Sequence, residues 1–383
     1  MTETAHRRKA LLLTTSAVIG GMERVTLGLA RALALRCWDV QTVFAPPTDR
    51  REFSAWCEAQ GVVPAFDRAV RQVVEPHRLT DVAALQHLVR MSKPEVVSIH
   101  YGGGHIPIKD VLAVRLATRQ RCFISVHSTV PWSVAGERKR TLTRLAAALV
   151  SGVICPSRAI RQIVIEAGVP RRKVHVVYNG IATPAPLPTR EESRAQLAIP
   201  RDRFVIGAVS RLVPEKGMDD LVEAVGRLAA ASSDVQLLIA GDGPERARLE
   251  AFARGRIGAR AIFLGALADP GLVYAASDVC ARSSHVEGFG IVFLEAALFG
   301  VPGIGTRVGG IPEAIVDGRT GVLVRPRAPA ELASAIERLR NDGRLRHRLG
   351  AAARERVLAE FTDEGMARGY ERLFCSAGAA APR

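Results

Sequence analysis

Two glutamates, Glu287 and Glu295, lie eight positions apart, and Gly288-Phe289-Gly290-Ile291 follows the first of them. If residues 289–299 form a helix, Glu287 precedes its first turn and Glu295 comes about two turns later, so both carboxylates address the N-terminal end of the helix. Free N–H groups and the helix dipole make that end an anion site, and the two glycines let a ligand approach the backbone. The spacing predicts a pocket for a phosphate that carries a sugar.

Two permanent cations, Arg211 and Lys216, follow the apolar segment 204–209, which has the composition of a buried strand. In open α/β sheets ligands bind beyond the carboxyl ends of the strands, and a phosphate group needs cations there. The chain contains no Asp-x-Asp sequence that could hold a divalent ion for such a substrate. We therefore expect these cations to bind phosphate without a metal.

Two further candidates lie in the first half of the chain. Gly20-Gly21 separates an expected strand at residues 9–15 from an expected helix at 22–35, where it can present N–H groups to a phosphate or simply form a tight turn. His127 follows an expected strand at 122–126. A lone histidine is more often structural, but a place at the carboxyl end of a strand favours a functional role.

The sequence around these residues resembles the retaining nucleotide-sugar glycosyltransferases of family 4, which have the GT-B fold. Five blocks follow the order and spacing of that family, and this makes the resemblance specific although a lone Glu-x7-Glu would be weak. The blocks are Gly20-Gly21-Met22-Glu23-Arg24, Tyr178-Asn179-Gly180-Ile181, the segment 209–217, Ala240-Gly241-Asp242-Gly243-Pro244, and the Glu287 block with Gly309-Gly310-Ile311-Pro312-Glu313 behind it.

The resemblance assigns roles to the candidate residues. Arg211 and Lys216 would grip the donor diphosphate and stabilise the departing nucleotide. Glu295 would hold the ribose hydroxyls. Glu287, with the backbone of residues 288–290, would fix the hydroxyls of the sugar.

Other parts of the donor site follow from the same resemblance. Gly20, Gly21 and Ile291 would contribute to donor binding, and the nucleobase would bind near Leu267, mostly through backbone groups. His127 would lie beside the transferred sugar, contributed by the other domain. No cofactor is implied, and the donor would be a UDP-, GDP- or ADP-sugar.

Strand-like and helix-like segments alternate along the chain, which predicts an α/β fold with doubly wound parallel sheets. Together with the resemblance, this pattern predicts GT-B: two Rossmann-like domains facing each other across a cleft. We expect an acceptor-side domain at residues 1–182, a proline-containing linker at 183–202, and a nucleotide-sugar-binding domain at 203–361. A last helix, at 362–376, would cross back to the first domain.

Charge is unevenly distributed along the 383 residues, which carry a formal net charge of +15. Residues 1–180 contain 26 Lys and Arg against 13 Asp and Glu, whereas the rest contains 27 against 25. This asymmetry indicates an anionic partner for the first half, whether lipid headgroups, a phosphorylated acceptor or nucleic acid, unless the chain is merely rich in arginine. Only 5% of residues are aromatic and no zinc or helix-turn-helix pattern occurs, so we expect no nucleic acid.

The sequence has no apolar run of the roughly 18 residues that a membrane helix needs, and its first residues lack a signal-peptide cleavage site. We expect a cytoplasmic protein, in peripheral contact with the inner face of the cell membrane through its basic N-terminal half. The candidate contacts are Arg68, Arg71, Arg78, Arg138, Lys139 and Arg140.

The predicted function is a retaining, metal-independent hexosyltransferase. It would move a sugar to a glycan, lipid-linked or small-molecule acceptor in cell-surface polysaccharide or glycolipid synthesis, with a lipid-linked glycan precursor fitting the charge best. A GT-B nucleotide-sugar epimerase or hydrolase is an alternative within the fold. A non-catalytic protein that binds nucleic acid or an anionic surface is an alternative of another class.

Overall fold

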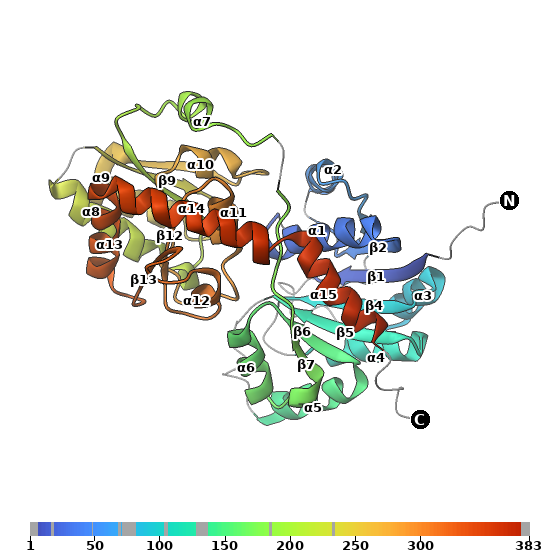
Figure 1. Cartoon of the computed structure of the whole chain (residues 1–383). Helices are drawn as coiled ribbons and strands as arrows, with labels where there is room; N and C mark the ends of the chain where they lie inside the picture. The colour runs from blue at the N-terminus through green and yellow to red at the C-terminus, as the bar shows by residue number, and fades with distance from the viewer. Residues whose placement is uncertain are drawn as a thin grey trace. The chain divides into compact units, whose positions relative to one another are not determined.

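The structure is a computed structural model that describes residues 7–16, 19–47, 49–67, 70, 82–102, 106–127, 137–183, 186–231 and 234–376. The chain divides into two compact units (Figure 1). The first comprises Met1–Ala182 and Asp363–Arg383, and the second comprises Thr183–Thr362. Each unit is built on a parallel sheet covered by helices, which confirms the predicted α/β class with two Rossmann-like domains.

In the described part of the first unit, the sheet has seven strands in the order β3-β2-β1-β4-β5-β6-β7. The strands are β1 Arg8–Thr14, β2 Trp38–Phe44, β3 Ala65–Phe66, β4 Val96–Tyr101, β5 Arg121–Val126, β6 Gly152–Cys155 and β7 Val174–Val176. The helices are α1 Gly21–Leu35, α2 Arg50–Ala59, α3 Val82–Ser92, α4 Ile108–Ala117, α5 Glu137–Leu149, α6 Arg158–Glu166 and α15 Asp363–Cys375. Because β4 is buried on both faces, it is an uninterrupted run of buried residues rather than an alternating one.

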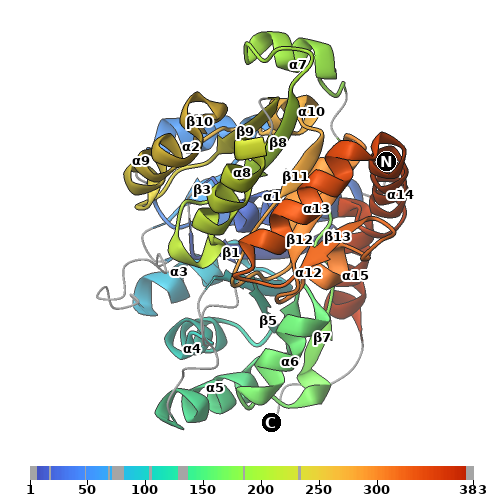
Figure 2. The same cartoon turned by 90° about the vertical axis from the view of Figure 1, so that its left-hand side faces the viewer.

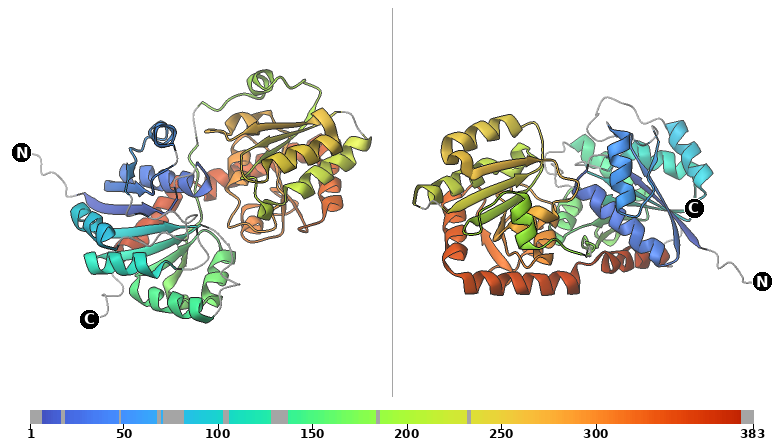
Figure 3. Two further views of the ribbon diagram at one scale, coloured as in Figure 1. Left: turned by 180° about the vertical axis from the view of Figure 1, so that it is seen from behind. Right: turned by 90° about the horizontal axis from the view of Figure 1, so that it is seen from above.

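The last helix, α15, lies alongside α1 in the first unit (Figure 3). Arg31 donates to the Asp363 carboxylate at 2.6 Å. Arg36 pairs with Glu371, which also accepts from the Trp38 indole at 3.1 Å. These contacts fix a helix from the end of the sequence against a unit that the first 182 residues otherwise form.

The described residues of the second unit form a six-stranded sheet in the order β10-β9-β8-β11-β12-β13. The strands are β8 Phe204–Val209, β9 Val235–Ala240, β10 Ala261–Gly265, β11 Val279–Ala281, β12 Gly303–Thr306 and β13 Gly321–Val324. The helices are α7 Arg190–Gln196, α8 Met218–Ala231, α9 Arg246–Ile257, α10 Gly271–Ala276, α11 Ile291–Leu298, α12 Ile311–Ala314, α13 Pro329–Asn341 and α14 Gly343–Glu360. Helix α7 lies inside the segment 183–202 that the sequence suggests as a linker.

Alternate residues of β8 point to opposite faces of this sheet. Phe204 and Ile206 pack in a core cluster with α8, α9 and α13, helices that Figure 2 shows in front of the strands. Val205, between them, packs with Val273 of α10 on the other face. The sheet is therefore covered on both faces, as a parallel sheet requires.

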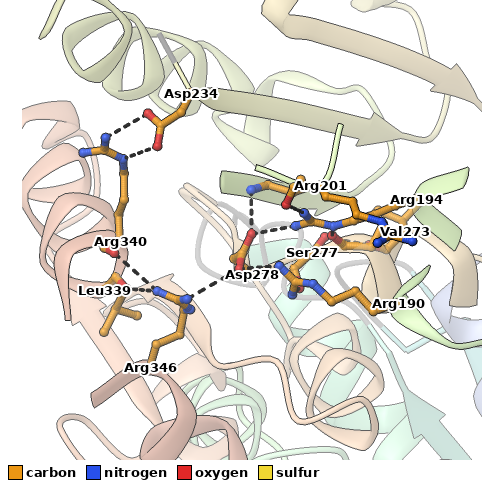
Figure 4. Close-up of polar contacts among 12 residues, drawn as sticks. Arg190, Arg194, Arg201, Asp234, Val273, Ser277, Asp278, Leu339, Arg340 and Arg346 are labelled. Carbon is orange, nitrogen blue, oxygen red and sulfur yellow. Dashed lines mark hydrogen bonds and ion pairs between the residues drawn. The ribbon is translucent and has the colours of Figure 1, made fainter. Parts of the chain in front are cut away.

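A buried carboxylate joins the helices of the second unit to its sheet at the amino ends of the strands (Figure 4). Asp278 accepts from the backbone N–H of Val205 at 2.8 Å and pairs with Arg194 at 2.9 Å, and both of these side chains are 5% exposed. Arg190 and Arg346 reach the other carboxylate oxygen at 2.7 and 3.7 Å. The cluster holds α7 and α14 in place, and it leaves the carboxyl ends of the strands for the candidate site.

Candidate active site

The candidate site of the second unit is built on two loops that follow neighbouring strands. One loop follows β8 and carries Arg211 and Lys216, and the other follows β11 and leads through Glu287 into α11. Because β8 and β11 are adjacent and parallel, both loops leave the same edge of the sheet. The cations and the glutamate are 71 positions apart in sequence at their nearest, yet the fold brings them together.

Glu287 is the centre of a buried charged cluster. One oxygen, Oε2, lies 3.2 Å from Lys216 Nζ and 3.1 Å from Arg282 Nη2. The hydroxyl of Ser284 lies 3.4 Å from the same oxygen. The side chains are little exposed, at 16% for Glu287, 13% for Lys216 and 4% for Arg282. Burial opposes ionisation of Glu287, but the charges of Lys216 and Arg282 outweigh it and hold the pKa of the carboxyl below its ordinary value.

Lys216 ends a 3-10 turn, Pro214–Lys216, whose next residue, Gly217, has φ 58°. A Cβ at Gly217 would lie 2.4 Å from the carbonyl oxygen of Ser283, so only glycine fits this approach. The hydroxyl of Ser283 donates to the Gly217 carbonyl at 2.5 Å, and the N–H of His285 donates to the Glu215 carbonyl at 2.9 Å. The two loops are thus fastened to each other, and the ammonium is held against Glu287. Burial lowers the pKa of Lys216, although Glu287 opposes the shift.

Arg211 differs from Lys216 in its exposure. Its side chain is 59% exposed, and its nearest carboxylate is Glu215 at 3.8 Å. A surface pair of this kind is worth little, so the guanidinium can turn toward a ligand at small cost. The loop therefore offers one fixed and one adaptable cation.

Helix α11 begins two residues later than the sequence suggests, at Ile291 rather than Phe289. Gly290 precedes it with φ 91°, a conformation that interrupts the helix and that a larger residue would adopt only with strain. Phe289 is 2% exposed and packs edge-on against Phe361 at 5.5 Å, so its side chain anchors the loop and only its backbone can meet a ligand. Gly288 is buried, and its N–H hydrogen-bonds Glu287.

Glu295 lies further along α11, where Tyr274 of α10 donates its hydroxyl proton to Oε2 at 2.5 Å. Tyr274 is 1% exposed, so this hydrogen bond orients the carboxylate from within the core. Leu267 follows β10 and is partly buried. The glycine pair at 309–310 packs on the Glu287 backbone, since a Cβ at Gly309 would lie 1.8 Å from the Glu287 carbonyl oxygen.

The candidates of the first unit lie at the carboxyl ends of its central strands. Gly20 is the N-cap of α1 and Gly21 its first residue, and α1 is the helix that follows β1 in the chain. His127 follows β5, and its N–H donates to the carbonyl of Tyr101 at 3.0 Å. Its Nε2 lies 3.0 Å from Nδ1 of His100, at the end of β4. Burial lowers the pKa of His127 to about 4.

Several residues of these sites are not apparent from sequence alone, among them Arg282, Ser284, Tyr274 and His100. The position of Arg282 directly after β11 was the signal that could have revealed it, because a cation there meets the same edge as Lys216. Of the expected membrane contacts, the side chain of Arg140 is described and exposed, whereas Arg68, Arg71, Arg78 and the side chains of Arg138 and Lys139 lie outside the described residues. Within the described part of the chain, no three His, Cys, Asp or Glu side chains form a metal-binding group, and no helix is long and apolar enough to span a membrane.

Two family models match consecutive parts of the chain. Residues 19–184 match the model described as Glycosyltransferase Family 4, and residues 189–356 match Glycosyl transferases group 1. A curated relative, N-acetyl-alpha-D-glucosaminyl L-malate synthase of Bacillus anthracis, is 26% identical over 78% of this chain and 79% of that protein. D-inositol 3-phosphate glycosyltransferase of Corynebacterium diphtheriae is 36% identical, but over 50% of this chain and 47% of that one.

Solved structures agree on the fold. Anabaena HepE in complex with UDP and glucose superposes with a TM-score of 0.78 at 23% identity, over 96% of this chain and 99% of that one. Sucrose-phosphate synthase from Thermosynechococcus elongatus has a TM-score of 0.80 at 22% identity, over 96% and 98%. The two family matches and the shared architecture confirm the resemblance seen in the sequence: the chain belongs to family 4 of the glycosyltransferases and has the GT-B fold.

Proposed function

We propose that this glycosyltransferase moves a sugar from a nucleotide diphosphate sugar with retention of the anomeric configuration and without a metal ion. The observation that carries the proposal is the cluster of Lys216, Arg282 and Glu287 at the N-terminal end of α11, with Arg211 exposed on the adjoining loop. Three cations, Arg211, Lys216 and Arg282, lie against two carboxylates, Glu215 and Glu287, which leaves an excess of positive charge where the helix end already favours an anion.

The excess charge suits a departing nucleoside diphosphate. Lys216 is fixed and little exposed, so it can stabilise phosphate charge as that charge develops, without first having to be ordered. Arg211 can close on the phosphates from the exposed side. The cations would thereby supply the stabilisation that a divalent ion gives in other transferases.

The two glutamates have binding roles in this proposal. Lys216 and Arg282 both hold Oε2 of Glu287, which makes the carboxylate a poor nucleophile. The other oxygen, Oε1, would accept a hydrogen bond from a hydroxyl of the sugar. Glu295, oriented by Tyr274, would accept the ribose hydroxyls. We assign no covalent intermediate, and attack on the same face from which the diphosphate leaves accounts for retention.

The names of relatives support an anionic or lipid-linked acceptor. They include the inositol 3-phosphate enzyme, a GDP-mannose-dependent phosphatidylinositol monomannoside mannosyltransferase of Corynebacterium glutamicum, and a lipopolysaccharide core glycosyltransferase of Rhizobium meliloti. The UDP complexes of HepE support a UDP-sugar as the first donor to test. We place the reaction in cell-surface polysaccharide or glycolipid synthesis.

Peripheral membrane contact is the second part of the proposal, and the packed helices α4 and α5 support it. Leu116 is 65% exposed on α4, and Leu145 is 54% exposed on α5. Lys109 and Arg140 are exposed on the same two helices. Exposed leucines and exposed cations on two neighbouring helices suit the interface of an anionic bilayer, where the apolar side chains enter the headgroup region and the cations meet phosphate.

The test is a thermal-shift screen of the purified protein against UDP-, GDP- and ADP-sugars, followed by assay of the stabilising donor with and without acceptor. Stabilisation by one nucleotide series, and transfer to an acceptor, would support the proposal. Turnover of the donor without any acceptor would favour an epimerase or hydrolase. Salt-sensitive binding of RNA with no donor binding would favour the non-catalytic alternative.

A further inference from the structure

His100 is a buried titratable side chain of the first unit for which the proposed mechanism has no use. It is 0% exposed at the end of β4, and its ring stacks parallel to Tyr370 of α15, with centroids 6.3 Å apart and an interplanar angle of 7°. Its Nδ1 atom lies 3.2 Å from Thr26 Oγ1 and 3.0 Å from His127 Nε2. One nitrogen therefore faces two polar atoms, and the position of its proton determines that of His127.

The hydroxyl of Thr26 determines whether His100 Nδ1 carries a proton. It lies 2.9 Å from the carbonyl of Met22, one turn back in α1, and a carbonyl can only accept, so the single hydroxyl proton is donated there. Thr26 Oγ1 consequently faces His100 Nδ1 with a lone pair. Nδ1 must then carry a proton to make this hydrogen bond.

The surroundings of the other ring nitrogen of His100, Nε2, also favour a proton on Nδ1. Its Nε2 is buried, and none of the described residues offers it a hydrogen-bond partner. If the proton were on Nε2, a buried N–H would be left without an acceptor and Nδ1 would face the Thr26 lone pair. With the proton on Nδ1, only a lone pair is left without a partner, which is the cheaper arrangement.

The proton on His100 Nδ1 determines the tautomer of His127. Two N–H groups cannot point at each other across 3.0 Å, so Nε2 of His127 must accept from His100 Nδ1–H, which is shared with Thr26. A neutral imidazole with its lone pair on Nε2 carries its proton on Nδ1. Both rings are neutral near pH 7, because burial lowers the pKa of His100 well below its ordinary value and that of His127 to about 4.

We infer that His100 is a positioning residue that holds His127 as the Nδ1–H tautomer, so that His127 offers a hydrogen-bond donor, and not a base, to an oxygen of the transferred sugar. The assignment of the sugar oxygen rests on the proposed function, whereas the tautomer does not. Thr26, on α1, thus sets the proton position on a ring at the end of β5 through one intervening histidine.

The direct test is the nitrogen-15 NMR signature of the His127 ring in the ligand-free wild-type protein at pH 7, assigned with a His127→Ala variant. We expect a protonated Nδ1 and an unprotonated Nε2. A protonated Nε2 would overturn the inference whatever the enzyme's activity is. The measurement needs no substrate, so its failure is distinct from a failure of the proposed function, which would appear as absent donor binding.

A pair of variants then separates positioning from structure. His100→Phe keeps the ring stacked on Tyr370 but removes the donor, and His100→Asn returns an N–H near the Nδ1 position. Loss of one neutral hydrogen bond predicts a fall of about tenfold in kcat/KM for His100→Phe, with substantial recovery in His100→Asn and unchanged affinity for the free nucleotide. In a His127→Ala background, His100→Phe should have no further effect on kcat/KM. The inference would be contradicted if His100→Phe lowered kcat/KM in the His127→Ala background as much as it does alone. It would also be contradicted if His100→Phe changed the tautomer of His127 but left kcat/KM unchanged.

Discussion

Replacing Glu287 with glutamine should destabilise the second unit and increase the rise in its Tm when nucleotide binds. The carboxylate lies 3.2 Å from Lys216 and 3.1 Å from Arg282, and at an effective dielectric constant near 20 each pair contributes about 5 kcal/mol of attraction before desolvation. Removing one partner of a buried pair costs about 3–5 kcal/mol, because the remaining charge is left uncompensated. Glutamine keeps a hydrogen bond, so we expect about 3 kcal/mol.

For a domain of this size, that loss corresponds to a fall in Tm of about 6–12 °C for the second unit. Phosphate oxygens would replace the missing carboxylate, so a saturating nucleoside diphosphate should raise the Tm of Glu287→Gln more than that of the wild type. The assay is differential scanning calorimetry with and without nucleotide. The matched control is Glu331→Gln, which removes an exposed pair with Arg325 and should leave both values unchanged. If Glu287→Gln unfolds like the wild type, or gains no more from nucleotide than the control does, the buried cluster does not stabilise the second unit or bind phosphate as we expect.

The donor site, the histidine pair and the membrane contact can each be tested with variants or with a change of conditions. Glu295→Ala should weaken nucleotide binding by about 1.5–3 kcal/mol by calorimetry, and unchanged affinity would refute the ribose assignment. Arg211→Ala should lower kcat more than it raises KM, and a change in KM alone would leave it only a binding role. Because the pKa of His127 falls from 6.5 to about 4 on folding, the unfolded chain binds more protons between these values, so stability should decline as pH falls from 6.5 to 4, and less steeply in His127→Gln. Sedimentation with anionic liposomes should fall at high salt and in a Leu116→Ser/Leu145→Ser variant, which replaces the exposed leucines of α4 and α5, and no sedimentation at low salt would refute the membrane proposal.

Strands were the most predictable elements. The expected strand at 122–126 lies within β5 and the strand-like segment 204–209 coincides with β8, because strands buried on both faces are continuous apolar runs. Segment 62–66 also has the apolar composition of a strand, but only Ala65–Phe66 pairs with the sheet, at its edge. Edge pairing depends on a neighbour's position, which local composition does not encode.

The candidate site was predictable where a motif carries its residues and not where tertiary contacts do. The loop position of Glu287 followed from its glycines, and Ser157 caps α6 as its residue type suggests. The ion pair between Arg282 and Glu287 and the hydrogen bond from Tyr274 to Glu295 depend on how separate elements pack. Such contacts leave no periodicity in the sequence, so they emerge only from the folded chain.

The proposed reaction is retaining, metal-free transfer from a nucleotide diphosphate sugar. The most direct measurement is proton NMR of the first-formed product, made with the donor found by thermal shift and with excess EDTA present. We expect a product with the anomeric configuration of the donor, formed at the same rate with and without EDTA. An inverted product, or a reaction that EDTA abolishes and a divalent ion restores, would contradict it.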